Sequence, residues 1–358
     1  MLYRESGQFK TSYATDQQIF PIRQDRIAVV AIVAFAYLVV PLIANQYWLS
    51  AIMIPLLIFS LAAIGLNVLT GYAGQLSLGT AAFMAVGAFA AYNFVLRVPG
   101  MPILVAFVLG GICAAAIGIL FGLPSLRIKG FYLAVATLAA QFFVVWALTK
   151  FGWFSNYSSS GVINAQKMSI LGYSFDSPTA KYLLVLTIVV VMALAAKNLV
   201  RSSIGRAWMA VRDMDVAASV IGIRLMPTKL LAFAVSSFYC GVAGALYAFC
   251  YLGSVEPDGF SLEMSFRILF MIIIGGVGSI MGSFLGAGFI LLLPIFLDVA
   301  LPFIAALFGL PFASATVSHI QITVFGALIM FFLIVEPHGL ARLWQIAKEK
   351  LRLWPFPH

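Results

Sequence analysis

The chain has 358 residues, of which 63% are hydrophobic and only 9% are charged, and its formal net charge is +9. A soluble domain carries roughly a quarter charged residues, so this composition excludes water as the solvent for most of the surface. Apolar runs close to the roughly 20 residues that cross a bilayer core recur along the whole chain, which excludes a soluble domain with a single anchor. The composition therefore predicts an all-α, polytopic membrane protein.

Ten apolar segments are predicted to cross the membrane. In chain order they are residues 27–45, 50–70, 75–96, 102–123, 131–149, 181–199, 230–252, 264–276, 280–300 and 317–335. Ten crossings return the chain to the side on which it starts, and we expect both termini in the cytoplasm. The parts are then a cytoplasmic segment at 1–26, a transmembrane domain at 27–336 with a hydrophilic loop at 200–229, and a basic cytoplasmic tail at 337–358.

The distribution of charge agrees with this topology. Most of the 21 Lys and Arg residues fall in four segments, at residues 4–26, 127–129, 197–229 and 342–352, and the predicted crossings place all four on one side. Cytoplasmic loops are enriched in Lys and Arg, so topology explains the basicity and no nucleic-acid partner is expected. The opposite side is predicted to carry the 150–180 loop and an acidic loop with Glu256, Asp258 and Glu263.

Two glycine-rich segments interrupt the apolar runs, GYAGQLSLG at residues 71–79 and GGVGSIMG at residues 275–282. Irregular backbone at membrane depth persists only where protein or a water-filled cavity covers it. Paired breaks in the two halves predict broken helices, an internal pseudo-repeat and a solute pathway. The alternative is that these glycines only permit close helix packing.

Small polar side chains near these breaks could contact a solute, although Ser and Thr often bond to their own helix instead. The candidate pathway residues are Gly71, Gly74, Gln75, Ser77, Gly79, Tyr132, Thr137, Gln141, Gly275, Gly276, Gly278 and Ser279.

Residues 200–229 keep a helical rhythm in spite of their polarity. One apolar face is formed by Ile204, Trp208, Val211, Met214, Ala218 and Ile221. This spacing predicts one amphipathic helix that ends at Gly222 as a C′ glycine, with Pro227 preventing simple continuation. Such a helix either offers its surface to a partner protein or lies in the plane of the lipid headgroups.

Several motifs together resemble the bacterial branched-chain amino acid ABC permeases, the LivM-like branch. They occur in that family's order between about residues 60 and 300, which is most of the chain. The motifs are Asn67–Thr70 before GYAGQLSLG, residues 127–132 before Ala136–Ala139, the run SIGRAWMAVRD at 203–213, Leu231–Phe233 before residues 241–247, and GGVGSIMG.

The resemblance implies that the 200–229 loop couples the chain to a separate ATP-binding subunit. The importer signature Glu-Ala-Ala, three residues, Gly is matched at Ala217, Ala218 and Gly222, while the acidic residue is displaced to Asp215. A rigid helix transmits a partner's movement because it moves as a unit. The candidate coupling residues are Arg206, Arg212, Asp213, Asp215, Ala217, Ala218 and Gly222.

The resemblance also implies an inner-membrane permease in bacteria, working with two ATP-binding subunits, a second homologous permease and a periplasmic solute-binding protein. The sequence holds no G-x-x-x-x-G-K-[ST] phosphate loop, so ATP and Mg²⁺ are expected on the partner subunits and no cofactor on this chain. The three His residues are scattered and no metal-ligand spacing occurs. The sequence shows neither a positioned nucleophile nor an acid–base pair, so an enzyme is not expected.

Two other functions remain open at this point. One is an ion-coupled carrier, which would hold ionisable groups at membrane depth; the candidates are Arg267, Asp298 and Glu336, all near predicted span ends. The other is an ABC permease of the same family for urea, short amides or small carboxylates, which the motifs do not separate from an amino acid permease.

Overall fold

The computed structural model describes residues 11–12, 18–19, 23–126, 130–158, 162–164, 169–170, 173–174, 177–308, 314–335 and 339–353. This part of the chain is almost entirely helical. Glu336, the pair Arg127 and Lys129, and part of the 150–180 loop lie outside the described residues. The predicted all-α membrane fold is confirmed.

Helices account for the transmembrane domain. In chain order they are α2 (Arg23–Leu38), α3 (Val40–Ile43), η1 (Trp48–Met53), α4 (Ile54–Asn67), η2 (Val68–Tyr72), α5 (Thr80–Arg97), α6 (Ile103–Gly122), η3 (Leu123–Leu126), α7 (Phe131–Lys150), α8 (Pro178–Arg201), α9 (Ser203–Asp213), α10 (Asp215–Val220), α11 (Leu225–Leu246), η4 (Tyr247–Leu252), η5 (Asp258–Phe260), α12 (Leu262–Gly275), α13 (Ile280–Phe308), α14 (Ser314–Val335) and α15 (Gly339–Leu353).

Eight of the ten predicted crossings correspond to helical stretches that are long and apolar enough to span a bilayer. They are Asp25–Ile43, Trp48–Tyr72, Thr80–Arg97, Ile103–Gly122, Phe131–Lys150, Pro178–Arg201, Leu225–Leu252 and Ile280–Ala300. The predicted span at 264–276 is instead α12, whose 14 residues reach only about 21 Å at 1.5 Å per residue. The segment at 317–335 lies in the 22-residue helix α14.

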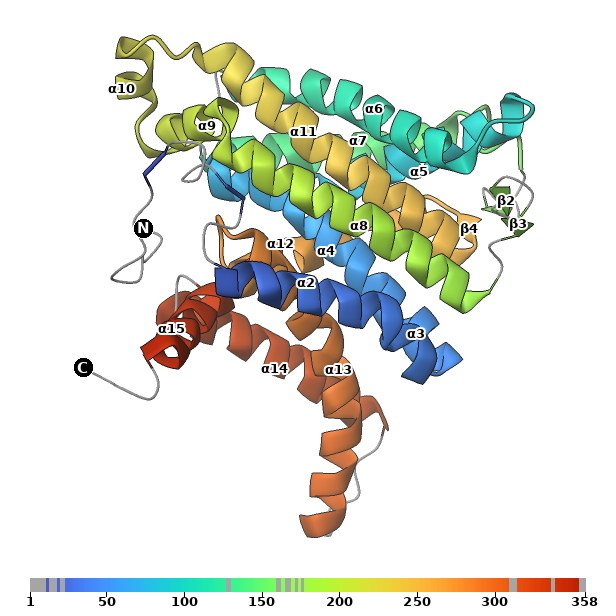
Figure 1. Cartoon of the computed structure of the whole chain (residues 1–358). Coiled ribbons are helices and arrows are strands. Elements are labelled where there is room, and N and C mark those ends of the chain that lie inside the picture. The colour runs from blue at the N-terminus through green and yellow to red at the C-terminus, as the bar shows by residue number, and fades with distance from the viewer. Residues whose placement is uncertain are drawn as a thin grey trace.

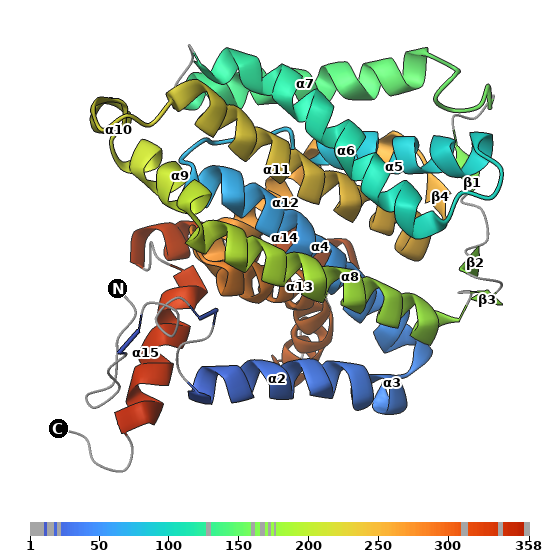
Figure 2. The same ribbon diagram turned by 45° about the horizontal axis from the view of Figure 1, so that its top comes forward.

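The helices run between two distinct ends of the molecule (Figure 1). One end carries α9, α10 and α15 and is called the coupling end below (Figures 1 and 2). At the far end β1 (Ile163–Asn164) pairs antiparallel with β4 (Ser254–Val255), so the 150–180 loop meets the acidic loop there. A second short hairpin joins β2 (Ser169–Ile170) and β3 (Tyr173–Ser174). Among the described residues, the basic segments at 197–229 and 342–352 therefore lie at the opposite end of the bundle from the acidic loop.

Glycines bring the central helices α5, α6 and α11 into close contact. A Cβ at Gly87 of α5 would overlap the backbone of Gly241 in α11, and one at Gly244 would overlap the carbonyl of Met84. A Cβ at Gly110 of α6 would lie 2.5 Å from the Gly87 carbonyl oxygen. Small residues allow backbones to approach this closely in membrane bundles, where packing replaces the hydrophobic effect as the driving force.

The helix that contains the predicted span at residues 280–300 is longer than the sequence indicated. Helix α13 continues through Pro302 to Phe308 as one 29-residue helix, and only residues 309–313 lie outside the description. Its C-terminal half extends away from the bundle (Figure 1). Residues 301–308 are therefore helical, although Pro302 lies among them.

We predict that Gly244→Ala destabilises the protein, because the added methyl group has no space against the Met84 backbone. Overpacking of this kind costs about 1–3 kcal/mol. The measurement is the thermal unfolding midpoint of the purified chain in detergent. Gly326→Ala is the matched control, since no described atom lies within 4 Å of its added Cβ; equal midpoints for the two variants would contradict the packing argument.

Candidate functional site

The two glycine segments, far apart in sequence, meet at the coupling end of the bundle. The first follows η2 and precedes α5, and the second joins α12 to α13. A Cβ at Gly71 would overlap both the Gly278 backbone nitrogen and Asn67 Oδ1. Gly278 itself has φ +80°, a conformation that side-chain-bearing residues rarely adopt. We call the contact between Gly71, Asn67, Gly278 and Ser279 the glycine node.

Asn67 holds the glycine node together. Its Nδ2 donates to the Ser279 carbonyl oxygen at 2.8 Å and to Ser283 Oγ at 3.0 Å. Its Oδ1 accepts from the Gly278 backbone N–H at 2.7 Å. Since Asn67 is only 1% exposed, these bonds satisfy backbone groups that the broken helix would otherwise leave buried and unpaired.

A second polar cluster surrounds the N-terminus of α5. Thr137 of α7 accepts from the Leu78 N–H at 2.9 Å, and Gln141 Oε1 accepts from the Ala82 N–H at 2.6 Å. Ser265 of α12 accepts from the Ala81 N–H at 2.9 Å. Three neutral side chains from two other helices therefore cap the free amides of a helix that begins inside the bundle.

Two buried polar side chains beside this cluster have no hydrogen-bond partner. Both amide atoms of Gln75 are unpartnered, although the residue is only 5% exposed. The Thr80 hydroxyl, on the first residue of α5, is also unpartnered and the residue is 1% exposed. Leaving such groups unpaired is costly, which sets these two positions apart from the satisfied polar groups around them.

The structure brings most of the predicted pathway residues together and leaves one apart. Gly79 packs against α7, where a Cβ would lie 2.8 Å from the Thr137 carbonyl oxygen, and the Ser77 hydroxyl accepts from the Gly79 N–H at 3.3 Å. Gly275 is buried against Gly282 of α13, and Gly276 has φ +119°. Tyr132, in contrast, is 75% exposed on the surface of α7.

The prediction of one continuous amphipathic helix over residues 204–221 is wrong. The chain forms two helices, α9 and α10, separated at Met214, which is extended with φ −158° and ψ 95°. The break sends neighbouring side chains to different partners: Asp215 Oδ2 lies 3.9 Å from Lys229 Nζ of α11, and Arg212 reaches the glycine node. Met214 and Ile221 are exposed as a result, whereas Trp208, Val211 and Ala218 are buried.

Gly222 ends α10 as predicted. It has φ +91°, its N–H donates to the Ser219 carbonyl at 3.1 Å, and the Ile223 N–H donates to the Ala218 carbonyl at 3.0 Å. These are the two bonds of a Schellman motif, which a glycine accommodates without strain. Ala217 is exposed on α10 and Ala218 is buried beneath it.

Arg212 joins the helix pair to the glycine node. Its Nη1 donates to the Gly71 carbonyl oxygen at 2.8 Å, and its Nε lies 2.8 Å from Asp213 Oδ1. A Cβ at Gly74, which has φ +68°, would lie 2.6 Å from Arg212 Cγ. Gly74 is therefore the surface on which the arginine side chain rests. Arg206 makes a different contact, from Nη1 to the Arg201 carbonyl at 3.0 Å.

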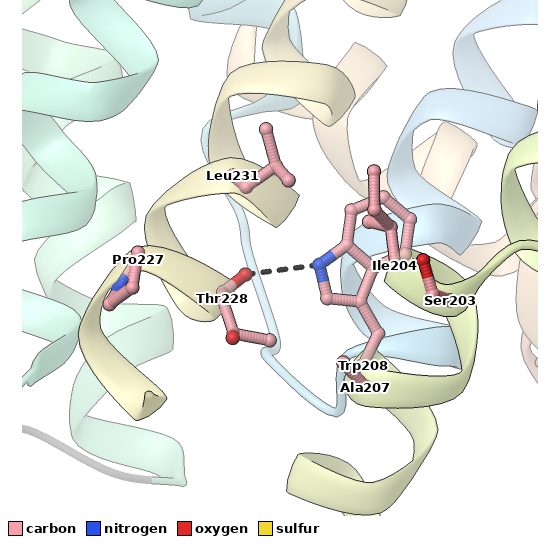
Figure 3. A pocket seen from close by; sticks show the side chains of 7 residues that line it. All are labelled: Ser203, Ile204, Ala207, Trp208, Pro227, Thr228 and Leu231. Atoms are coloured by element: carbon pink, nitrogen blue, oxygen red, sulfur yellow. Dashed lines mark hydrogen bonds between the residues drawn. The ribbon is translucent and has the colours of Figure 1, made fainter. Parts of the chain in front are cut away.

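Trp208 anchors α9 to the bundle. It is fully buried in a cluster with Val68 and Leu69 of η2 and with Phe233 of α11. Its Nε1 donates to the Thr228 carbonyl at 3.0 Å, as Figure 3 shows. A largely apolar cavity of about 250 Å³ lies between α9 and α11. It is lined by Ser203, Ile204, Ala207, Trp208, Pro227, Thr228 and Leu231 (Figure 3).

Sequence reasoning did not select Asn67, Ser265, Ser283 or Thr80 as site residues. The sequence did contain a signal for Asn67, because it is a polar residue that ends an apolar run just before the first glycine segment. The two serines gave none, since their partners lie 216 and 184 positions away. Within the described residues, no group of three or more His, Cys, Asp or Glu side chains has the arrangement of a metal site.

Comparison with known proteins identifies the family. Residues 48–335 match the family model described as branched-chain amino acid transport system / permease component. The chain is 31% identical over 248 residues to the high-affinity branched-chain amino acid transport system permease protein LivM of Salmonella typhimurium, and 31% identical over 249 residues to that of Escherichia coli. Each alignment covers 62% of this chain and 57% of the relative, so the match spans little more than half of their length.

A more distant relative carries a different solute in its name. The chain is 33% identical over 95 residues, 25% of its length and 27% of the relative, to the autoinducer 2 import system permease protein LsrC of Klebsiella pneumoniae. No solved structure matches the chain. Because the family model covers most of the sequence and the helical bundle fits it, this chain belongs to the family of branched-chain amino acid transport system permease components.

Proposed function

We propose that this chain is the membrane-spanning permease of a bacterial inner-membrane ABC importer for branched-chain amino acids. ATP is hydrolysed on two separate ATP-binding subunits, the pore is completed by a second homologous permease, and a periplasmic solute-binding protein delivers the solute. The names of the LivM relatives support the solute. The observation that carries the mechanism is the bond from Arg212 to the Gly71 carbonyl.

The Arg212 bond supports coupling because it connects an exposed cytoplasmic element to the point where the two glycine segments meet. Trp208 adds a second connection, since it packs on η2 immediately before Gly71. A movement of α9 therefore acts on η2 both through apolar packing and through a charged hydrogen bond. Rigid elements that move as units transmit a partner's closure in this way.

The docking surface for the ATP-binding subunit is the exposed side of α10. Apolar side chains gather on and beside it and stay exposed among the described residues: Met214 is 66%, Val216 67%, Val220 82% and Ile221 73% exposed. Exposed apolar patches of this kind mark contact sites for a partner. The cavity beside Trp208 lies next to this surface and is open to an apolar side chain of the same partner.

The solute passes the N-terminus of α5 on its way through the bundle. Gln75 and Thr80 offer an unpartnered side-chain amide and hydroxyl that can hydrogen-bond to a passing solute. All of these groups are neutral, so they solvate a zwitterion without holding it tightly. Weak contacts suit a permease whose selectivity is set by a separate receptor.

The arrangement gives little support to an ion-coupled carrier. Among the described residues, the buried charged side chain is Lys229, and it lies at the coupling end beside Asp215 rather than at membrane depth. Both Arg267 of α12 and Asp298 of α13 are exposed. A permease of the same family for another small solute remains the second candidate, which the LsrC relative illustrates.

Arg212→Ala is predicted to uncouple the transporter. The variant loses the bond to Gly71 but leaves the exposed surface of α10 in place, so the ATP-binding subunits still assemble and hydrolyse ATP while uptake falls at least tenfold. The measurement is solute uptake per ATP hydrolysed in proteoliposomes of the whole complex. Arg224→Ala, which removes an exposed arginine from the same loop, is the control; equal ratios for the two variants would refute the role of Arg212.

Val220→Asp is predicted to weaken assembly with the ATP-binding subunits. Val220 is 82% exposed, so the substitution leaves the fold of the chain alone unchanged while placing a charge in an apolar contact. The readout is the amount of ATP-binding subunit that copurifies, with the unfolding midpoint of the isolated chain as the test of folding. Tyr157→Asp at the far end, where Tyr157 is 79% exposed, serves as the control. Normal copurification of the Val220 variant would remove α10 from the interface.

Uptake by the reconstituted complex is predicted to require ATP and to be indifferent to proton and sodium gradients. The measurement is leucine accumulation in proteoliposomes loaded with ATP or with a non-hydrolysable analogue, with and without ionophores that collapse both gradients. Uptake that survives the analogue and disappears with the ionophores would move the protein to the class of ion-coupled carriers.

A further inference from the structure

A group of basic side chains lies at the coupling end, apart from the glycine node. Lys348 of α15 forms an ion pair with Asp25 of α2, with Nζ 2.5 Å from Oδ1. Lys197 of α8 interacts electrostatically with Arg201, Asp25 and Lys348. The group formed by Lys197, Arg201, Lys348 and Asp25, called the basic cluster below, therefore carries three positive charges and one negative.

The basic cluster contains a donor that the chain does not satisfy. Arg201 Nη1 is buried and has no hydrogen-bond partner. The guanidinium of Arg206 lies close by, since its Nη1 donates to the Arg201 carbonyl at 3.0 Å, and adds further positive charge. A buried guanidinium nitrogen without an acceptor, among excess cations, indicates a missing anion with oxygen acceptors.

The position of the cluster indicates what kind of anion it is. Arg201 is the last residue of the membrane-length helix Pro178–Arg201, and Asp25 is the first residue of the membrane-length stretch Asp25–Ile43. Ends of membrane spans lie at the level of the lipid headgroups. Helix α2 holds its place against α8 through Tyr37 Oη, which donates to Thr187 Oγ1 at 2.8 Å, and its own apolar side chains, such as Ile27 at 68%, remain exposed toward lipid.

Helix α15 is an amphipathic helix beside the basic cluster at the coupling end. Figure 2 shows it crossing the coupling end, crosswise to α2. Ala341 is buried against the bundle, while Leu343, Trp344 and Ile346 are 47%, 47% and 38% exposed. Basic helices with a bare apolar face and tryptophan lie in the boundary between headgroups and acyl chains.

We propose that the basic cluster binds the phosphate of an anionic phospholipid headgroup, with the acyl chains lying along the exposed apolar side chains of α2 and α15. The phosphate supplies the acceptor for Arg201 Nη1 and balances the excess positive charge. Free phosphate shares this chemistry, but it would leave the apolar face of α15 uncovered. The proposal rests on the proposed function in one point only: the coupling end faces the cytoplasm, so the bound lipid belongs to the cytoplasmic leaflet.

The lipid site has a consequence for the second glycine segment. Helix α15 begins at Gly339, where a Cβ would lie 2.6 Å from both the Gly276 nitrogen and the Ile274 carbonyl oxygen. A headgroup that fixes α15 through Lys348 therefore fixes the chain that presses on Gly276. Occupancy of the site therefore steadies the second glycine segment at Gly276.

The test measures binding to the full-length chain in neutral detergent. Short-chain phosphatidylglycerol, phosphatidylcholine and inorganic phosphate are titrated separately, with bound lipid counted by native mass spectrometry and the unfolding midpoint followed in parallel. Phosphatidylglycerol is expected to bind and raise the midpoint, while the other two have little effect. Equal responses to phosphatidylcholine would show an apolar site without charge recognition, and a full response to inorganic phosphate would show a free-anion site; either outcome overturns the proposal.

The double variant Lys197→Gln, Arg201→Gln is expected to bind phosphatidylglycerol about 30-fold more weakly, since each cation near an anionic surface contributes about fivefold. Arg224→Gln, at the same end but outside the cluster, is expected to bind as the unmodified chain does. Unchanged affinity of the double variant overturns the proposal.

The depth of α15 is tested independently of folding effects by the quenching of Trp344 fluorescence with brominated lipid. The Trp344 signal is obtained as the difference between the unmodified chain and the Trp344→Phe variant. An absence of quenching also overturns the proposal.

Failure of lipid binding is distinguishable from failure of the proposed function. Leucine uptake driven by ATP is measured on the same complex in bilayers of phosphatidylcholine alone. ATP-driven uptake in these bilayers together with an absence of phosphatidylglycerol binding would reject the lipid site and leave the importer assignment intact.

Discussion

The glycine node depends on the Asn67 side-chain amide, which makes two bonds to the second glycine segment. It donates to the Ser279 carbonyl oxygen and accepts from the Gly278 N–H. A helix that breaks inside a protein leaves backbone groups buried away from water, and each one left unpaired costs about 1–3 kcal/mol. One buried asparagine satisfies the Gly278 N–H and the Ser279 carbonyl together. Because the amide has a fixed geometry, the two segments are joined at one relative position rather than merely packed side by side.

This constraint makes the node a point at which movements from different parts of the chain converge. Arg212 reaches Gly71 from α9, and Gly339 at the start of α15 presses on Gly276. The C-terminal arm of the node is α13, which begins directly after Ser279. Glycine suits such a junction because it permits both the close approach and the positive φ angles, and any larger residue at Gly71 would separate the segments.

The sequence was sufficient to predict the two glycine-rich breaks, eight helices of membrane-spanning length and the glycine that ends α10. Gly222 could be identified because a Schellman cap has a local requirement for positive φ. The break at Met214 could not, since the apolar spacing of three and four residues continues unchanged from α9 into α10. What interrupts the helix is the separate anchoring of Arg212 on Gly71 and of Asp215 near Lys229, and both partners are distant in sequence.

The same limit explains the errors within the candidate site. Tyr132 was selected because it belongs to a motif, but a motif does not give the rotation of α7, and the side chain is on the outer surface. Ser265 and Ser283 were missed because a lone serine in an apolar run is most simply a helix residue bonded to its own backbone. Only the packing of α12 and α13 against the glycine segments gives these hydroxyls a partner in another helix.

The choice of arginine at position 212 follows from the geometry that the coupling requires. Its Nε reaches Asp213 while Nη1 reaches the Gly71 carbonyl, so one planar group bridges the end of α9 and the glycine node. A lysine ammonium is a single point at the end of a flexible chain and would hold these two acceptors less rigidly. The guanidinium also lies in the last turn of α9, where its charge is stabilised by the negative end of the helix dipole. A movement of α9 is therefore passed on through a rigid fork, and the response of the node follows the orientation of that helix as well as its distance.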